Sequence, residues 1–245
     1  MRAIVLAAGF ATRLHPLTRD RAKPLLDVCG RPVLSWLCDK IAGVSGLSEL
    51  AIVGNGRFFP QLEGWRAGYA CPLPVHLIDD GTQNNEHRLG GIGDLALALK
   101  SRPSDDEGYL VAAGDNLIEF DLQPHAAAFR RHGQTLLLVR AIDGPVPPRR
   151  HGEVVVDAQD RIVAFREKPE QPRSPLASLC LYFFPPAVLG WVRDYLAGGG
   201  NPDAPGHFLA WLVPRQPVHA ARIQVRLFDI GYLEALERAR REFRG

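Results

Sequence analysis

The sequence predicts an α/β fold with a doubly wound, mostly parallel, Rossmann-like sheet and a small antiparallel subdomain. Two patterns lead to this prediction. Through the first half of the chain, short apolar runs alternate with helical patterns, as in parallel strands joined by crossover helices. In the second half, two strand-like runs flank a short polar turn, which is typical of an antiparallel hairpin.

The elements of the first half follow from their apolar runs. Residues 2–8 (RAIVLAA) are apolar at all but one position, as in a strand buried on both faces. Further strands are expected at Leu50–Val53, Val75–Ile78, Tyr109–Ala113 and Thr135–Arg140, and helices from about Pro32 and at about 57–68, 91–100 and 122–132. Such sheets bind ligands beyond the carboxyl ends of their strands, so chemistry is expected after Ala8, Ile78 and Ala113.

The second half is expected to form the antiparallel part. Its hairpin joins Glu153–Val156 and Arg161–Arg166 through a turn at Asp157–Asp160, and another strand is expected at Ser178–Phe184. The stretch 198–206 (GGGNPDAPG) is expected to be a loop between two helices, and a last helix is expected from Tyr232 to Phe243. We therefore expect one domain over residues 1–245, with halves at 1–140 and 141–245.

Composition excludes several classes of partner. The chain has 245 residues, of which 46% are hydrophobic, and its formal net charge is +2 with acids and bases interspersed. This balance argues against binding to nucleic acid or to a membrane surface. The apolar start is too short for a membrane span and has no cleavage site. Four scattered cysteines without metal-ligand spacing favour reduced thiols and a cytoplasmic location.

The loop after the first strand is a candidate triphosphate site. It contains Gly9 and Arg13, and Lys23 follows ten residues later. A triphosphate needs close backbone N–H groups and a fixed cation, which such a loop offers, although an ordinary strand-to-helix turn with solvated bases has the same composition. The segment has no G-x-G-x-x-G and no G-x-x-x-x-G-K-[ST], so dinucleotide-binding oxidoreductases are weakly supported and P-loop enzymes are excluded.

Two aspartates at strand ends form a candidate metal site. Asp115 ends the apolar run that begins at Val111, and Asp229 follows the run Val225-Arg-Leu-Phe. Mg²⁺ prefers hard oxygen ligands, commonly one or two carboxylates completed by water and substrate phosphate. Helix capping is the alternative interpretation for both residues, because aspartate is common at helix N-termini.

These segments together resemble the sugar-1-phosphate nucleotidyltransferase family. LAAGFATRLHPLTRDRAKPLLDVCGRPVL is similar to the family signature, with Gly9, Thr12, Arg13, Lys23 and Pro24 in matching places. The GDN at Asp115, the D-I-G at Asp229 and the E-K-P at Glu167 match as well. The resemblance implies a Mg²⁺-dependent enzyme in which residues 1–140 bind a nucleoside triphosphate (NTP). Residues 141–245 would then bind a phosphorylated small-molecule acceptor and complete the metal site.

The resemblance also implies roles for individual residues. Arg13 and Lys23 would grip the triphosphate, and the backbone of Leu6, Ala8 and Gly9, with Thr12, would lie against the nucleotide. Asp115 and Asp229 would hold Mg²⁺, and Lys168 would contact the acceptor phosphate. Glu167, Gly152 and Asn116 would contact the rest of the acceptor. Ala11 departs from the family's second glycine, which is tolerable where φ is negative.

The stretch Asn84–Leu95 (NNEHRLGGIGDL) lies where the family recognises base and ribose. Backbone groups of Gly90, Gly91 and Gly93 could hold the nucleobase, with Asn85 and Asp94 nearby; the alternative is a polar loop and a helix N-cap at Asp94. The loop departs from the thymidylyltransferase pattern, so the base stays open: the GDN motif favours dTTP or UTP, and GTP or CTP are alternatives.

The acceptor is open as well. Leu179 and Cys180 replace a Thr-Gly pair that usually faces the sugar, and NPDAPGHF has no counterpart in the common pattern. A sugar 1-phosphate is expected, with a cyclitol phosphate, a polyol phosphate or a phosphonate as alternatives. A non-catalytic nucleotide-sugar sensor is a further alternative, disfavoured because Arg13, Lys23 and both aspartates are present together. The sequence leaves a homo-oligomer open.

Overall fold

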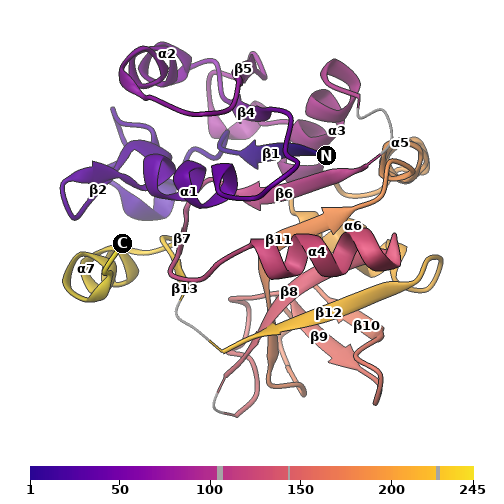
Figure 1. Cartoon of the computed structure of the whole chain (residues 1–245). Coiled ribbons are helices and arrows are strands. Elements are labelled where there is room, and N and C mark those ends of the chain that lie inside the picture. Colours follow the sequence, from indigo (N-terminus) through magenta and orange to yellow (C-terminus); the bar gives the residue numbers. More distant parts are fainter. Residues whose placement is uncertain (104–106, 143, 225–226) are drawn as a thin grey trace.

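The protein is described by a computed structural model that covers residues 1–103, 107–142, 144–224 and 227–245. Its centre is a sheet in which four parallel strands occur in the order β6-β1-β4-β5. These strands are β1 (Arg2–Leu6), β4 (Leu50–Gly54), β5 (Val75–Asp79) and β6 (Tyr109–Ala113). The expected parallel sheet is therefore present, and Figure 1 shows these strands in the N-terminal part of the molecule.

Beyond β6 the same sheet changes character. β11 (Leu176–Phe184) runs antiparallel to β6 and also to β8 (Thr135–Ala141), and β12 (Val218–Ile223) pairs in parallel with β8. The hairpin of β9 (Glu153–Val156) and β10 (Ile162–Arg166) continues from the first half of β11. The antiparallel hairpin is thus confirmed, but β8 lies beside β11 rather than beside a parallel strand of the first half. The sequence analysis missed β12, a short strand of mixed polarity.

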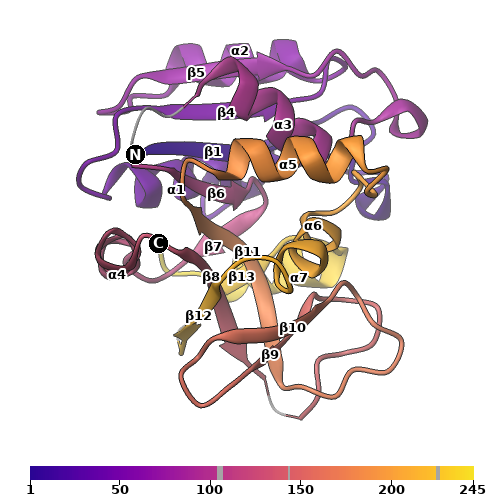
Figure 2. The same cartoon turned by 90° about the vertical axis from the view of Figure 1, so that its right-hand side faces the viewer.

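Helices cover both faces of this sheet and create two cores. α1 (Val33–Ala42), α2 (Phe59–Gly68) and α4 (Gln123–His132) pack on one face, where Leu34, Leu62 and Phe129 are buried with Val5. α3 (Gly91–Ser101), α5 (Val188–Ala197) and α6 (Pro205–Leu212) cover the other face with Ile4. Figure 2 views the molecule from this second face, where α5 lies across the sheet.

A third, smaller core joins the C-terminus to the segment that follows the loop after β1 (residues 7–13, called the phosphate loop below). α7 (Leu233–Glu242) packs near β2 (Asp27–Val28), β3 (Arg31–Pro32) and the two-strand sheet of β7 (Asn116–Ile118) and β13 (Leu227–Asp229). Its buried residues include Leu14, Leu26, Leu117, Phe228 and Leu236. This cluster fixes the segment after Arg13, the segment after Asp115 and the segment around Asp229 against one another.

A few boundaries differ from the sequence prediction. β1 ends at Leu6, and the expected strand residues Ala7 and Ala8 continue as a buried loop in which the Ala7 N–H donates to Val53 O at 2.8 Å. β7 was not expected. Val225 and Arg226, part of the run expected before Asp229, lie outside the described residues. None of the described helices combines the length and the apolar character that crossing a bilayer requires.

Candidate active site

The predicted site residues line two adjoining cavities at the carboxyl edge of the parallel strands. The larger has a volume of about 650 Å³. Its lining includes Leu6, Ala8, Gly9, Thr12, Arg13, Lys23, Asn85, Gly90, Gly91, Asp94, Asp115, Lys168 and Asp229. The smaller, about 180 Å³, is lined by Asn116, Gly152 and Glu167, and shares Asp115, Lys168 and Asp229 with the larger. Residues more than 200 positions apart therefore face one space.

The loop after β1 approaches this space through an unusual backbone conformation. Ala11 has φ 49° and ψ 43°, in the left-handed region. Alanine was expected to be tolerable here only with a negative φ, and the observed φ is positive. A residue with a Cβ pays about 1–2 kcal/mol for this conformation. The loop is held by bonds to the Ala11 carbonyl from Thr18 Oγ1 at 2.8 Å and from the Leu14 N–H at 2.9 Å.

Lys23 and Asp115 form an ion pair on the cavity floor. Lys23 is the first residue of a short 3-10 helix, Lys23–Leu25, and Asp115 lies between β6 and β7. Burial alone would raise the pKa of Asp115, but the neighbouring Lys23 ammonium outweighs it and holds that pKa below the ordinary value. Asp115 is therefore ionised at neutral pH. Because β7 rather than a helix follows Asp115, the helix-cap interpretation is wrong for this residue.

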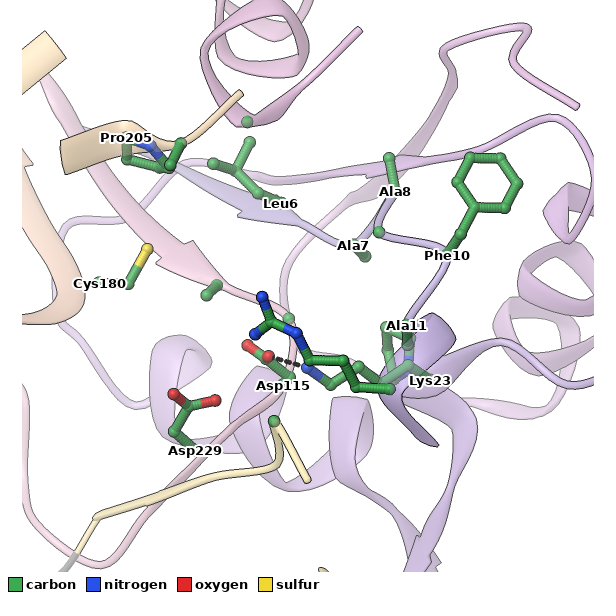
Figure 3. A pocket seen from close by; sticks show the side chains of 18 of the residues that line it. Leu6, Ala7, Ala8, Phe10, Ala11, Lys23, Asp115, Cys180, Pro205 and Asp229 are labelled. Atoms are coloured by element: carbon green, nitrogen blue, oxygen red, sulfur yellow. Dashed lines mark hydrogen bonds and ion pairs between the residues drawn. The ribbon is translucent and has the colours of Figure 1, made fainter. Parts of the chain in front are cut away.

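Asp229 is brought beside Asp115 by backbone pairing. β13 pairs with β7 so that Asp229 stands opposite Asn116, and the Ile230 N–H donates to Asp115 O at 3.2 Å. Figure 3 shows both carboxylates facing the same space, with Lys23 bonded to Asp115. The N-cap of α7 is Tyr232, so helix capping is also wrong for Asp229.

The two carboxylates have different affinities for protons. Solvent reaches Asp229, but protein surrounds it within the cavity, and these surroundings together with the Asp115 charge raise the pKa of Asp229 to about 6. A divalent cation between the two groups would remove this repulsion, and hard carboxylate oxygens suit Mg²⁺. No group of three or more His, Cys, Asp or Glu within the described ranges could hold a metal. Two carboxylates with open positions fit an ion completed by water and phosphate.

The glycine loop at the start of α3 has a different partner from the one expected. The Gly91 N–H donates to Asp203 O at 2.9 Å, and the Ile92 N–H donates to Pro202 O at 2.8 Å. A Cβ on Gly90 would lie 2.4 Å from Pro202 O, and Gly90 has φ +82°. The absence of side chains at Gly90 and Gly91 therefore lets residues 202–205 pack against this loop. The N–H of Gly91, which was expected to face a nucleobase, is already bonded to Asp203. Arg88 adds an ion pair with Asp203 at 2.7 Å.

Asp94 is a buried acid within the first turn of α3, where Gly90 is the N-cap, so the capping interpretation is wrong here too. Burial and the nearby Asp80 carboxylate raise the pKa of Asp94 to about 8. One buried oxygen of each group, Asp94 Oδ1 and Asp80 Oδ2, has no other hydrogen-bond partner among the described residues. A single proton shared by the pair would satisfy both oxygens at neutral pH.

The smaller cavity is shaped around Glu167. A Cβ on Gly206 would lie 1.8 Å from Glu167 Oε2, and a Cβ on Gly152 would lie 3.3 Å from the same atom and 2.5 Å from Phe165 Cζ. Lys168 pairs with Glu167 at 3.2 Å and has φ +44°, an uncommon conformation of the kind found at functional sites. The side-chain amide N–H of Asn116 donates to the Leu179 carbonyl oxygen at 2.8 Å, which connects the GDN segment to β11.

Several further polar residues in the cavities had no role in the sequence analysis, among them Arg140, Arg150, His151 and Tyr232. Arg140 lies at the carboxyl end of β8, so the strand-end argument used for Asp115 could have found it. Burial, followed by the charges of Arg140, Arg150 and Lys168, lowers the pKa of His151 to about 4. Its imidazole is therefore neutral at physiological pH and offers one donor and one acceptor.

Cys180 also borders both cavities. It has φ +52° at the register shift of β11 between Ser178 and Tyr182, where the strand changes partner from β9 to β6. Burial raises the pKa of the Cys180 thiol to about 12, so it is not a thiolate at neutral pH. Figure 3 shows its sulfur at the edge of the space between Asp229 and Pro205.

Known structures share this arrangement of strands and helices. A UDP-glucose pyrophosphorylase complexed with UDP-glucose superposes with a TM-score of 0.79 at 17% identity, over 98% of this chain and 97% of that one. A Bacillus anthracis protein assigned as a glucose-1-phosphate thymidylyltransferase gives a TM-score of 0.81 at 21% identity, over 98% and 94%. At these identities the likeness shows the fold alone. The chain therefore has the mixed α/β fold of these two structures.

Sequence comparison supplies the family. The chain belongs to the nucleotidyl transferase family, whose model matches residues 2–244. It is 28% identical over 94% of its length to a UTP–glucose-1-phosphate uridylyltransferase of Synechocystis sp., covering 60% of that protein. It is 32% identical over 79% of its length to a glucose-1-phosphate thymidylyltransferase of Streptomyces antibioticus, covering 52%. The chain thus spans between half and two thirds of these relatives.

Proposed function

We propose that the protein condenses an NTP with a sugar 1-phosphate to give a nucleoside diphosphate sugar and pyrophosphate. The observation that carries the proposal is that Arg13, Lys23, Asp115, Lys168 and Asp229 line one cavity. The names of its relatives, which include uridylyl-, thymidylyl- and guanyltransferases for glucose or mannose 1-phosphate, support this substrate class. Among nucleotides we favour dTTP or UTP.

We assign the two halves of the cavity to the two substrates. Residues 1–140 would bind the nucleotide, with the backbone of Leu6, Ala8 and Gly9 against the nucleoside and Arg13 on the triphosphate. Residues 141–245 would bind the acceptor, with Lys168 on its phosphate and Glu167 on its hydroxyls. The neutral His151 is suited to donate to or accept from an acceptor hydroxyl without adding charge. Asn85, Thr12 and Asp94 would contact the nucleotide.

The chain's own residues act mainly by positioning and by neutralising charge. An oxygen of the acceptor phosphate attacks the α-phosphorus of the NTP, the α–β phosphoanhydride bond breaks, and pyrophosphate leaves with that electron pair. Lys23 and Arg13 stabilise negative charge on the nucleotide phosphates, and Lys168 steers the attacking phosphate. The attacking phosphate oxygen is already ionised at neutral pH, so no residue has to act as a general base.

Asp115 and Asp229 would hold Mg²⁺ in this reaction. When bound, the ion supplies charge that screens the α-phosphate from the acceptor phosphate. The Lys23–Asp115 pair keeps Asp115 ionised for this role, whereas Asp229 must lose its proton near pH 6. The pairing of β13 with β7 brings these two acids together.

The test is pyrophosphate release with each of the common NTPs against a panel of sugar 1-phosphates, with cyclitol and polyol phosphates included. We expect release with at least one sugar 1-phosphate that depends on Mg²⁺. Nucleotide binding without release for any pair would contradict the proposal and favour a non-catalytic sensor. Release only with a cyclitol or polyol phosphate would retain the chemistry and change the acceptor.

A further inference from the structure

The aromatic ring of Tyr232 lies between the two halves of the site and carries two guanidinium groups. Arg13 Cζ lies 5.5 Å from the ring centroid, and Arg13 Nη1 donates to the Tyr232 hydroxyl at 3.3 Å. Arg150 Cζ lies 5.2 Å from the same centroid. Contacts of this kind with an aromatic face orient a guanidinium without neutralising it. Tyr232 therefore holds two cations in one part of the cavity.

Neither guanidinium forms an ion pair with an acid in the part of the chain that the structure describes. Tyr232 is instead the contact that they share: its ring faces both guanidinium groups, and its hydroxyl accepts a hydrogen bond from Arg13. Three other cations of the cavity have acidic partners: Lys23 pairs with Asp115, Lys168 with Glu167 and Arg88 with Asp203. Two neighbouring uncompensated guanidinium groups in a cavity repel each other, and an anion with two phosphate groups would relieve that repulsion.

Arg150 belongs to the acceptor side of the chain, whereas Arg13 belongs to the phosphate loop. The backbone of Arg150 is fixed by a turn, in which the Arg150 N–H donates to the Pro147 carbonyl oxygen at 3.3 Å. The preceding Arg149 N–H donates to Pro169 O at 3.0 Å, beside Lys168. Arg150 thus reaches from the loop that also carries the acceptor-binding Gly152 toward the nucleotide loop, and both arginines line the larger cavity.

We propose that Arg13 and Arg150, oriented by Tyr232, form an arginine pair that binds the β- and γ-phosphates of the nucleotide and afterwards the pyrophosphate product. The inference rests on the proposed function and extends it. Arg150 contacts the diphosphate group directly, and Tyr232 is a positioning residue. Arg150 lies on the loop that also carries Gly152, in the acceptor half of the chain. Movement of this loop would therefore affect both acceptor binding and the retention of pyrophosphate.

The first test measures binding of inorganic pyrophosphate with Mg²⁺ by isothermal titration calorimetry, without turnover. We expect Arg150→Ala to weaken binding roughly tenfold or more, as for loss of a charge-assisted contact. The matched control is Arg149→Ala, which removes the neighbouring arginine; Arg149 pairs with Glu170 at 2.5 Å and does not line the cavities. Equal weakening by both variants, or none by Arg150→Ala, would overturn the inference.

The second test separates a positioning role of Tyr232 from a structural one. Tyr232→Phe keeps the ring and removes the hydroxyl, whereas Tyr232→Leu removes the ring that orients both guanidinium groups. We expect Tyr232→Leu to raise KM for pyrophosphate in the reverse reaction roughly tenfold, with KM for the sugar nucleotide changed little. Tyr232→Phe should recover most of the loss. A uniform fall in kcat with an unchanged KM for pyrophosphate would contradict the role.

These outcomes distinguish the inference from the proposed function. If the wild-type protein binds pyrophosphate through Arg150 but releases none from any NTP and sugar phosphate, the arginine pair stands and the proposed reaction fails. If the wild-type protein catalyses the reaction and Arg150→Ala leaves pyrophosphate affinity and KM unchanged, the reaction stands and the arginine pair fails.

Discussion

The two ends of the larger cavity are built in different ways: the end at Asp115 and Asp229, which is the proposed metal end, and the end at the start of α3, which is the proposed base end. At the metal end, Asp115 and Asp229 are placed by paired backbones, and their charges face an open space beside Lys23. At the base end, the N–H of Gly91 and the guanidinium of Arg88 are already bonded to Asp203, and Asp94 lies beside Asp80. At the metal end the charged groups pair with one another and still face the open cavity, whereas the base end uses several of its polar groups to hold remote segments together.

The largest effect is expected at the metal end. Asp115→Asn removes one of the two carboxylate charges that we propose hold Mg²⁺, so we expect loss of about 3–4 kcal/mol of transition-state stabilisation, or several hundred-fold in kcat. The measurement is steady-state pyrophosphate release at saturating Mg²⁺, with thermal unfolding as a check on folding. Near-normal turnover would show that Asp115 holds no essential metal.

At the base end the expected effect falls on stability first. Gly90→Ala adds a methyl 2.4 Å from Pro202 O at a φ of +82°, so we expect a loss of about 2–3 kcal/mol in the free energy of unfolding. Gly64→Ala is the control, because Gly64 lies within α2 with open space around it. There the same change should raise stability by up to about 1 kcal/mol. Similar effects at both positions would refute the docking of residues 202–205 on this loop.

The Asp80–Asp94 contact predicts a dependence of stability on pH. The pKa of Asp94 is raised from 3.8 to about 8 in the folded protein, so the folded state binds the extra proton. Its contribution to stability is therefore full below about pH 4, declines as pH rises and is lost above about 8. In Asp94→Asn, the amide can donate to Asp80 at any pH.

We expect Asp94→Asn to be more stable than the wild type by about 1–2 kcal/mol at pH 8, with the difference vanishing toward pH 4. Urea unfolding of both proteins at pH 4, 6 and 8 measures this difference. A gap that does not change with pH would mean that the two carboxyl groups do not share a proton.

The smallest effect is expected at Ala11 in the phosphate loop. Ala11→Gly relieves the left-handed conformation at φ 49° but adds chain entropy to the unfolded state, so we expect a net gain of about 0.5–1 kcal/mol. Thermal unfolding should show a small rise in Tm. A loss of stability would mean that the alanine methyl makes a contact worth more than the strain.

The two ends also differ in how far the sequence could predict them. Asp115 follows the apolar strand β6, so the sequence indicated its place at the carboxyl edge of the parallel sheet. Asp229 ends β13 in a separate two-stranded sheet, and its match to the family motif rather than a strand-end rule predicted that it shares the cavity with Asp115. The parallel strands around β1 followed from continuous apolar runs in the same way. The same reasoning could have included Arg140, which stands at the end of β8.

Contacts between remote segments could not be predicted in this way. The docking of Asp203 on Gly91 and the contact of Arg150 with Tyr232 join positions separated by dozens of residues with no shared periodicity. β12 was missed because alternating small, polar and apolar residues give only a weak strand pattern, and its pairing with β8 supplies the order. The left-handed φ of Ala11 is likewise set by the fold of the loop rather than by its residue type.

Metal binding by the two aspartates tests the central claim most directly. Mn²⁺ substitutes for Mg²⁺ and can be titrated by its electron paramagnetic resonance signal in the presence of nucleotide. We expect one Mn²⁺ per chain at pH 7.5, with affinity that falls as pH drops below about 6, because protonation of Asp229 competes with the metal. The double variant Asp115→Asn, Asp229→Asn should lose this binding. Unchanged Mn²⁺ affinity in the double variant would contradict the account.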